Sequence, residues 1–276
     1  MRRLCWLLAF VAPPSFAGPV GYAQATGYYK KDSRPTLYQP LNLLDGREAT
    51  AWCTSSADPL NDELTFGFKG PAKIDEIRIY TGNGFDEKTF AEFARVKRLS
   101  IKGPSGAETI SVADQRGLQA IPFNPPLVGE HFTMEVMDIY PGEDPDSPAC
   151  ITDVVFYQEG KPLNGSWLTQ KLKYDKHQAP LLGTWFAGHE GAPDRFVSFF
   201  FDGTYRFLFH TYDPDVKDRS FGGTYDASGG RLSIEVPPKG RVSAKIHREG
   251  AGKGAHTLTL EGDLPEDLKQ TYRDHL

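Results

Sequence analysis

The residues best equipped for chemistry stand close together in residues 42–53. This stretch carries an acid in an Asp-Gly turn (Asp45), an indole (Trp52) and a thiol (Cys53). A catalytic thiol needs a nearby base to form the thiolate, and it needs a compartment that keeps it reduced. The stretch therefore has two interpretations. It is either part of an active site, or a turn, a core anchor and one half of a disulfide.

Patterns that mark an active site are missing from the sequence. The 7 histidines show no His-Glu-x-x-His spacing, and neither a Gly-x-Ser-x-Gly elbow nor a Cys-x-x-Cys pair occurs. Acid pairs such as Asp144 and Asp146 stand in proline-containing loops, whereas a glycosidase needs two acids that converge in a cleft. We therefore predict no enzyme and no catalytic residues. The alternative is a secreted hydrolase or effector whose site lies in residues 181–276.

The N-terminus has the pattern of a signal peptide over residues 1–23. Arg2 and Arg3 precede an apolar run at residues 4–12, and Ala17 and Ala23 offer two cleavage positions. The run is far shorter than the ~20 apolar residues of a membrane span, so an uncleaved anchor is the weaker interpretation. We expect an exported protein, periplasmic or extracellular, with no membrane span.

Export also decides how the 3 cysteines are used. Cys5 leaves with the signal peptide, and the remaining pair, Cys53 and Cys150, predicts a disulfide. Such a bond closes a loop of ~100 residues and stabilises the fold by up to a few kcal/mol. Loss of Arg2 and Arg3 makes the net charge more negative than -5, which argues against a nucleic-acid partner.

Short alternating segments separated by glycine and proline predict an all-β fold. Residues 64–68 and 74–80 alternate, with Gly70 and Pro71 forming a turn between them. Further strands are expected at 95–101, 108–112, 118–123, 132–139 and 151–158, and a short helix at 86–93. Since no helical pattern separates the strands, an antiparallel sandwich is favoured. It is expected over residues 37–160, after an N-terminal arm at 24–36.

A second strand-rich unit follows a predicted linker at residues 161–180. It begins near Gly183 and shows about seven strands over residues 181–262, enough for a small antiparallel barrel. Residues 263–276 are expected to be a C-terminal tail. The sequence leaves the oligomeric state open.

A family resemblance rests on five groups of residues in the first unit. They are the stretch at 42–53 with its Asp45-Gly-x-x-x-Thr50-x-Trp52 phrase, residues 74–80, residues 82–85, the Arg95-Val-Lys segment, and residues 150–156. In this order they resemble a discoidin-like galactose-binding-like domain over residues 36–160. The most similar variant is the bacterial glycan-binding module associated with translocation of NAD glycohydrolases. The resemblance implies a jelly-roll sandwich that binds carbohydrate through loops at one end. Two positions depart from the pattern: Ala94 replaces a frequent Asn, and Asp153 replaces the usual Glu.

The resemblance and the residue types together suggest where ligands bind. Asp45 can ligate a structural calcium ion together with backbone carbonyls and Asp153, or it can simply form an Asx-turn. Sugar sites need an exposed aromatic ring and planar polar groups, and Asn83, Phe85 and Asp86 offer both in the loop at 82–93. Trp52 beside a cystine is better explained as core. The expected partner is a glycan or another cell-surface ligand.

The second unit resembles lipocalin-like small barrels through Gly183-Thr-Trp185 and the segment at 201–205. Two interiors follow from this resemblance. A carrier for a small hydrophobic molecule would have a dry cavity lined by phenylalanines, namely Phe199, Phe201, Phe207 and Phe209. The shortness of the strands favours a filled core instead. The function predicted from the whole sequence is therefore an exported, non-catalytic binding protein.

Overall fold

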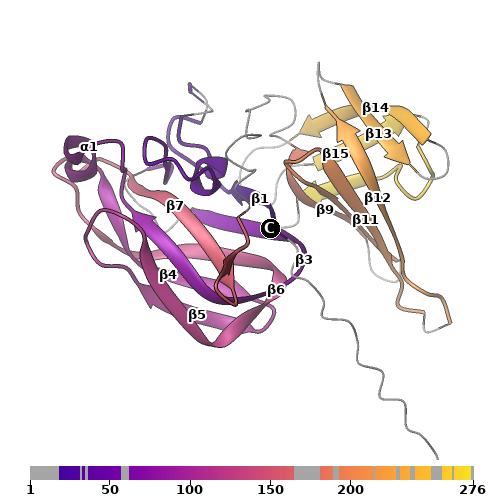
Figure 1. Cartoon of the computed structure of the whole chain (residues 1–276). Helices are drawn as coiled ribbons and strands as arrows, with labels where there is room; N and C mark the ends of the chain where they lie inside the picture. Colours follow the sequence, from indigo (N-terminus) through magenta and orange to yellow (C-terminus); the bar gives the residue numbers. More distant parts are fainter. Residues whose placement is uncertain are drawn as a thin grey trace, which may run out of the picture.

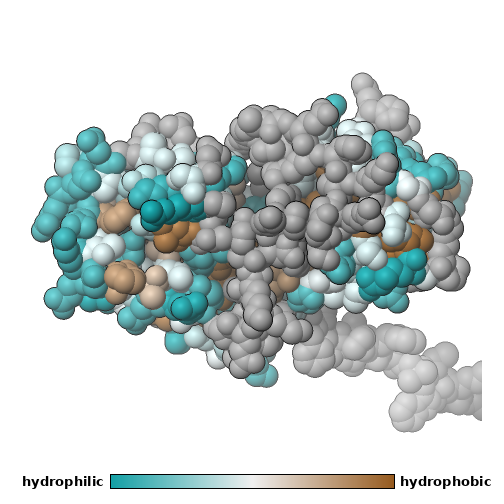
Figure 2. Space-filling model, turned by 90° about the horizontal axis from the view of Figure 1, so that it is seen from above, coloured by the Kyte–Doolittle hydropathy of each residue, from teal (hydrophilic) through white to brown (hydrophobic). Residues whose placement is uncertain are grey.

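The protein folds into a β-sandwich followed by a small closed β-barrel (Figure 1). The structure is a computed structural model that describes residues 19–31, 33–34, 37–56, 62–164, 181–188, 193–213, 215–227, 231–236, 240–249, 257–262 and 264–274. The predicted all-β class is confirmed, with a jelly-roll sandwich first and a barrel second. In the described residues, no helix has the length and apolar character of a membrane span. On the face seen in Figure 2, the described surface is mainly hydrophilic, and its hydrophobic areas are small.

The sandwich contains eight strands in one continuous hydrogen-bonded sheet that folds over on itself, in the order β1-β3-β6-β4-β7-β2, with β5 on β4 and β8 on β7. Their bounds are β1 Val20–Ala25, β2 Trp52–Cys53, β3 Glu63–Thr81, β4 Ala94–Gly103, β5 Gly106–Ser111, β6 Gln119–Tyr140, β7 Ala149–Gln158 and β8 Lys161–Pro162. Neighbouring strands are antiparallel except for the short β4–β7 pair. Part of the predicted linker is thus paired, because β8 lies against β7.

Two long strands replace pairs of predicted short ones. The segments expected at 64–68 and 74–80 form the single strand β3, and those at 118–123 and 132–139 form β6. Gly70 and Pro71 do not make a hairpin. The register of β3 on β6 shifts between Gly67 and Ala72 and again between Ile74 and Glu76. Such irregularities bend a strand without ending it, which lets β3 and β6 pass from one layer of the sandwich to the other.

The first strand lies where we expected the end of a signal peptide and an N-terminal arm. β1 pairs with β3, and Val20, Tyr22 and Ala23 are buried in the sandwich core. The boundary predicted between residues 23 and 24 therefore cuts through a core strand and is wrong. Residues 1–18, which contain the predicted basic start and apolar run, lie outside the described residues.

The sandwich core confirms the roles expected from the alternating pattern. Phe66, Phe68 and Phe156 pack edge to face at 5.0–5.2 Å, and Trp52 is fully buried as predicted. A 3-10 helix, η1 (Pro40–Leu44), buries all of its residues just before Asp45. The predicted short helix is confirmed as α1 (Glu87–Glu92).

The second unit is a closed barrel of eight strands in the order β10-β11-β12-β13-β14-β15-β16-β9. Their bounds are β9 Gly183–Ala187, β10 Asp194–Phe199, β11 Thr204–His210, β12 Arg219–Asp226, β13 Arg231–Val236, β14 Gly240–Glu249, β15 Thr257–Gly262 and β16 Thr271–Asp274. The predicted C-terminal tail is wrong, since β16 closes the barrel between β15 and β9. Leu264, Leu268 and Tyr272 from the same segment are buried in its core.

The barrel interior packs as one cluster of hydrophobic side chains. Phe199 and Phe207 are buried in it, and the Phe199 ring meets Tyr225 edge to face at 5.0 Å. Phe201, which we expected to line the same interior, lies instead in the core of the sandwich. This arrangement agrees with the filled core that the short strands favoured.

The turn between β10 and β11 joins the barrel to the sandwich. The Phe200 ring stacks on Tyr22 of β1, and the N–H of Phe201 donates to the carbonyl of Gly21 at 3.0 Å. A Cβ at position 21 would lie 2.5 Å from the Phe200 ring, so this close approach requires glycine. Asp202 pairs with Lys69 beside it. β1 therefore belongs to the sandwich and to the contact with the barrel at once.

Candidate functional site

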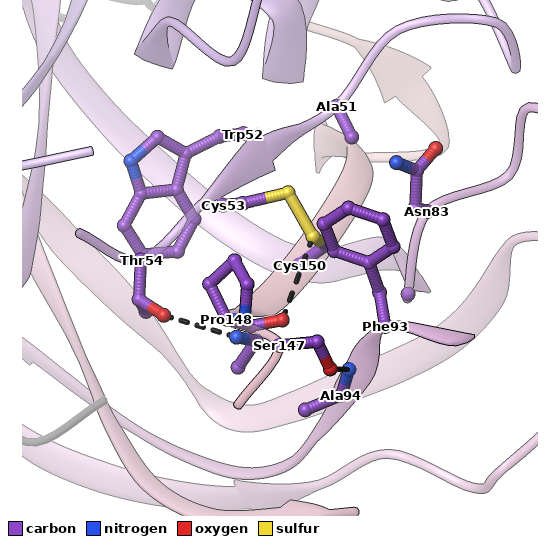
Figure 3. The surroundings of a disulfide bond; sticks show 12 residues. Ala51, Trp52, Cys53, Thr54, Asn83, Phe93, Ala94, Ser147, Pro148 and Cys150 are labelled. Carbon is purple, nitrogen blue, oxygen red and sulfur yellow. Dashed lines mark hydrogen bonds between the residues drawn. A yellow bond between two sulfur atoms is a disulfide. The ribbon is translucent and has the colours of Figure 1, made fainter. Parts of the chain in front are cut away.

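The predicted disulfide is present between Cys53 and Cys150 (Figure 3). The two cysteines are directly paired across β2 and β7, and Phe93 packs against them. Next to the bond, the Thr54 hydroxyl accepts from the N–H of Ala149 at 3.0 Å. The interpretation of residues 42–53 as part of an active site with a catalytic thiol is therefore wrong. The end of this stretch is a buried staple between two strands.

Asp45 forms the predicted Asx-turn just upstream. Its carboxylate accepts from the N–H of Arg47 at 3.0 Å and from the Thr50 hydroxyl at 2.8 Å. Asp45 is 8% exposed, and burial raises its pKa, although the Thr50 hydrogen bond works in the opposite direction. The turn is thus closed by hydrogen bonds among its own residues, and it holds a carboxylate in a largely buried place.

Asp153 lies close enough to Asp45 for their charges to interact. It is 7% exposed, and its Oδ1 is one of three buried side-chain atoms in the described residues that have no hydrogen-bond partner. Burial raises the pKa of Asp153 to about 7, and the neighbouring charge of Asp45 contributes to the shift. Two buried carboxyl groups with an unused oxygen are a natural environment for a cation. The described residues contain no cluster of three or more His, Cys, Asp or Glu, so backbone oxygens would have to complete the coordination.

The three residues predicted to bind sugar have different surroundings. Phe85 is 63% exposed. Asn83 is only 4% exposed, and its side-chain oxygen accepts from the N–H of Phe85 at 3.3 Å. Asp86 caps α1 by accepting from the N–H of Thr89 at 2.7 Å, a bond that lowers its pKa. Asn83 and Asp86 therefore shape the loop, and Phe85 presents an exposed aromatic ring.

An arginine that the sequence did not single out lies beside Phe85. Arg116 donates through Nε to the Tyr80 hydroxyl at 3.0 Å and through Nη2 to the carbonyl of Gly84 at 2.9 Å. The hydrogen bond to Tyr80 raises the pKa of Arg116, with smaller contributions from Glu87 and Glu48. Arg116 and Gly84 are 32 residues apart in the sequence. No local pattern indicates a contact of this kind.

The Asp45 turn, the Phe85 loop and the loop that carries Arg116 thus meet at one end of the sandwich. A Cβ on Gly84 would lie 3.0 Å from the backbone oxygen of Glu48, so the Asp45 turn touches the Phe85 loop directly. The Thr152 hydroxyl on β7 accepts from the N–H of Gly84 at 2.7 Å and so ties the Phe85 loop to that strand. The outcome is an exposed ring, a positioned guanidinium and an exposed carboxylate on a rigid base. We call Glu48, Phe85 and Arg116 the loop site.

Of the two other loops considered from the sequence, at 54–61 and 141–148, the second has a structural use. In the loop at 141–148, the Ser147 hydroxyl accepts from the N–H of Ala94 at 3.1 Å and donates to the carbonyl of Glu92 at 2.9 Å. Figure 3 shows Ser147 bonded to Ala94 beside the disulfide. A serine hydroxyl thus holds the backbone at Ala94. Most of the loop at 54–61 lies outside the described residues.

A family comparison agrees with this architecture. Residues 17–157 match the family model of the NAD glycohydrolase translocation F5/8 type C domain. The chain belongs to this family. The resemblance inferred from residues 36–160 is therefore confirmed, and the match extends it toward the N-terminus to include β1. The loop site and both predicted calcium ligands lie inside the region that matches this translocation-domain family. The barrel lies outside it.

Solved structures of carbohydrate-binding modules are similar to the translocation domain at low identity. One is the family 32 module of NanJ from C. perfringens in complex with galactose, at 18% identity, with 51% of this chain and 98% of that chain covered and a TM-score of 0.37. Another is the family 32 module of AlyQ in complex with 4,5-unsaturated mannuronic acid, at 15% identity, 51% and 98% coverage and a TM-score of 0.37. A third is CpGH89CBM32-5 from Clostridium perfringens in complex with GalNAc-β-1,3-galactose, at 17% identity, 51% and 99% coverage and a TM-score of 0.37. No curated protein matches the chain.

Proposed function

We propose that this chain is an exported, non-catalytic protein that binds glycans at the loop site. The observation that carries the proposal is the pairing of an exposed aromatic ring with a positioned guanidinium. Phe85 is 63% exposed, and Arg116 is held by two hydrogen bonds next to it. The C–H face of a sugar ring packs on an aromatic ring, while its hydroxyls need planar donors and acceptors. Phe85 supplies the ring, Arg116 the donors and Glu48 the acceptor.

The charges around the site favour a neutral glycan. The carboxylates of Glu48 and Glu87 interact with Arg116, and Asp86 lies in the same loop as Phe85. An anionic sugar would be repelled by these acids as it approached the guanidinium of Arg116. A neutral sugar can use Arg116 and Glu48 as donor and acceptor without that repulsion.

A glycan array probed with the full-length protein tests this proposal. We expect signals that concentrate on neutral glycans, measured in parallel with 1 mM EDTA and with calcium on the order of 1 mM, a concentration typical of extracellular calcium sites. No signal for any glycan under either condition would remove glycan binding as the function. Signals confined to sulfated or uronic glycans would contradict the role given to the local acids.

The structural calcium site belongs to the same proposal. Asp45 and Asp153 would hold the ion, together with backbone oxygens of the turn, and the unused Oδ1 of Asp153 fits this role. The ion would neutralise two nearby carboxylates and fix the turn that touches the Phe85 loop. In this proposal calcium supports the site and does not contact the sugar.

Export is supported by the disulfide. Bonds such as Cys53–Cys150 form and persist in oxidising compartments, which is where a glycan-binding protein would meet cell-surface ligands. The non-catalytic character rests on the lack of a catalytic motif in the sequence and on the polar groups of the loop site. Both of its polar side chains lie at the surface, where water would compete with any proton transfer.

A further inference from the structure

Two arginines face into the barrel at its free end. Arg195, Phe209 and Arg219 are direct cross-strand neighbours on β10, β11 and β12. Side chains alternate between the two faces of a strand, and Val197 and Phe207, two residues away, are buried in the barrel core. Arg195 and Arg219 therefore continue the inner face of the barrel to its rim. We call these three residues the rim row.

The free end is the one that points away from the sandwich. The turn between β10 and β11 docks on β1, whereas the rim row lies where β10 begins, β11 ends and β12 begins. Figure 1 shows the connection from β11 to β12 on the side of the barrel remote from the sandwich. The rim row thus lies at the opposite end of the barrel from the turn that contacts β1.

The two guanidinium groups lie over the same aromatic ring. Their central carbons are 5.2 Å (Arg195) and 4.5 Å (Arg219) from the centre of the Phe209 ring. Stacking on an aromatic ring holds the plane of a guanidinium and leaves its N–H edge free for hydrogen bonds. Phe209 therefore orients both arginines.

The partners of the two arginines differ. Arg219 donates through Nη2 to Asp267, 2.9 Å away. Arg195 donates through Nη1 to the carbonyl of Pro193 at 3.2 Å, and its buried Nε–H has no acceptor among the described residues. A buried donor without a partner is costly, and it commonly marks the place of a water, an ion or a ligand.

Two acids near this end, Asp194 and Asp218, form hydrogen bonds with other side chains. Asp194 accepts from the Tyr212 hydroxyl, and Asp218 Oδ2 lies 2.8 Å from His210 Nδ1. His210 is paired with Asp194 across β11 and β10, in the register position next to the pair of Arg195 and Phe209. Neighbouring residues of a strand point to opposite faces, so the side chains of Asp194 and His210 point away from the barrel interior. On the inner side, within the part of the chain that the structure describes, the carboxylate paired with these two arginines is that of Asp267, which bonds to Arg219.

We propose that the rim row binds an oxyanion, the carboxylate or phosphate group of a small molecule, between Arg195 and Arg219. The planar, fork-shaped donor edge of arginine matches both groups. The anion would accept from the unused Nε–H of Arg195 and share Arg219 with Asp267. This site lies in the barrel and is independent of the loop site and of glycan binding.

Phosphate and acetate titrations of the full-length, ¹⁵N-labelled protein test the proposal. We expect saturable shifts of the amide signals of Arg195, Phe209 and Arg219 with at least one anion. The anion that binds more tightly identifies the group as phosphate or carboxylate. If neither anion produces saturable shifts in these signals, the proposal is wrong and the Nε–H of Arg195 is served by water alone.

Variants of equal charge change provide the matched comparison. Arg195→Gln should weaken anion binding by about tenfold or more, because a charge-assisted hydrogen bond is lost. Arg241→Gln removes the same charge from an exposed arginine that bonds to Ser233 and Thr224, and it should leave binding unchanged. Equal weakening in both variants would show only a general effect of net charge and would overturn the proposal. If Arg195→Gln fails to fold, Arg219→Gln takes its place with the same expected loss.

Discussion

The substitution Asp153→Asn isolates the contribution that the buried pair of Asp45 and Asp153 makes to the pH dependence of stability. In the folded protein, burial and the neighbouring Asp45 raise the pKa of Asp153 to about 7, from an ordinary value of 3.8. Between these two values the folded state holds a proton that the unfolded chain has lost. The stability contributed by this group is therefore complete below pH 4 and falls as the pH rises to 7.

The size of the effect follows from the size of the shift. A displacement of about three pKa units corresponds to about 4 kcal/mol at most, lost between pH 4 and pH 8 when no cation is bound. Asn cannot ionise, so Asp153→Asn should lose this part of the pH dependence. At pH 8 in EDTA the variant should be more stable than the natural protein, while at pH 4 the two should differ little.

Urea unfolding at pH 4, 6 and 8 in EDTA, with both proteins measured in parallel, gives the required free energies of unfolding. Other groups titrate in this range, so the quantity of interest is the difference between the two proteins at each pH. Calcium should restore the natural protein at pH 8 and leave Asp153→Asn nearly unchanged. A difference that stays constant from pH 4 to pH 8 would refute the buried, coupled state of Asp153.

Two further predictions concern covalent features of the chain. Replacing both Cys53 and Cys150 with serine should lower the free energy of unfolding by about 2–5 kcal/mol. Glycan affinity should change little, because neither cysteine belongs to the loop site. Two free thiols in exported protein, found by mass spectrometry, would contradict the native bond. Signal cleavage should follow Ala17 rather than Ala23, because Val20 and Tyr22 are buried in β1; an intact mass that begins at Gln24 would contradict this placement.

Local sequence patterns predicted much of the sandwich, because segments such as residues 132–136 alternate between buried and partly exposed side chains. They also predicted the disulfide, since only one pair of cysteines remains after a signal is removed. The same patterns missed β1, because its small and apolar residues resemble the end of a signal peptide. They missed β16 as well, since a strand of four residues around the buried Tyr272 is too short to show a period.

The loop site was predicted only in part, for a different physical reason. An exposed aromatic in a glycine-rich loop is visible in the sequence, and Phe85 was found in this way. Whether a polar side chain is free depends on what surrounds it. Asn83 is buried, Asp86 caps a helix, and Arg116 reaches Gly84 across a distance of 32 residues. These relations arise from tertiary contacts, which a single sequence does not display.

Isothermal titration calorimetry of Phe85→Ala with the strongest glycan from the array tests the central claim most directly. Removing the ring should weaken binding by about tenfold, the equivalent of about 1.4 kcal/mol for lost stacking. Val128→Ala, which shortens a side chain that is 46% exposed on β6, serves as the control and should bind like the natural protein. If Phe85→Ala keeps full affinity, the glycan binds elsewhere and the loop site is not the binding site.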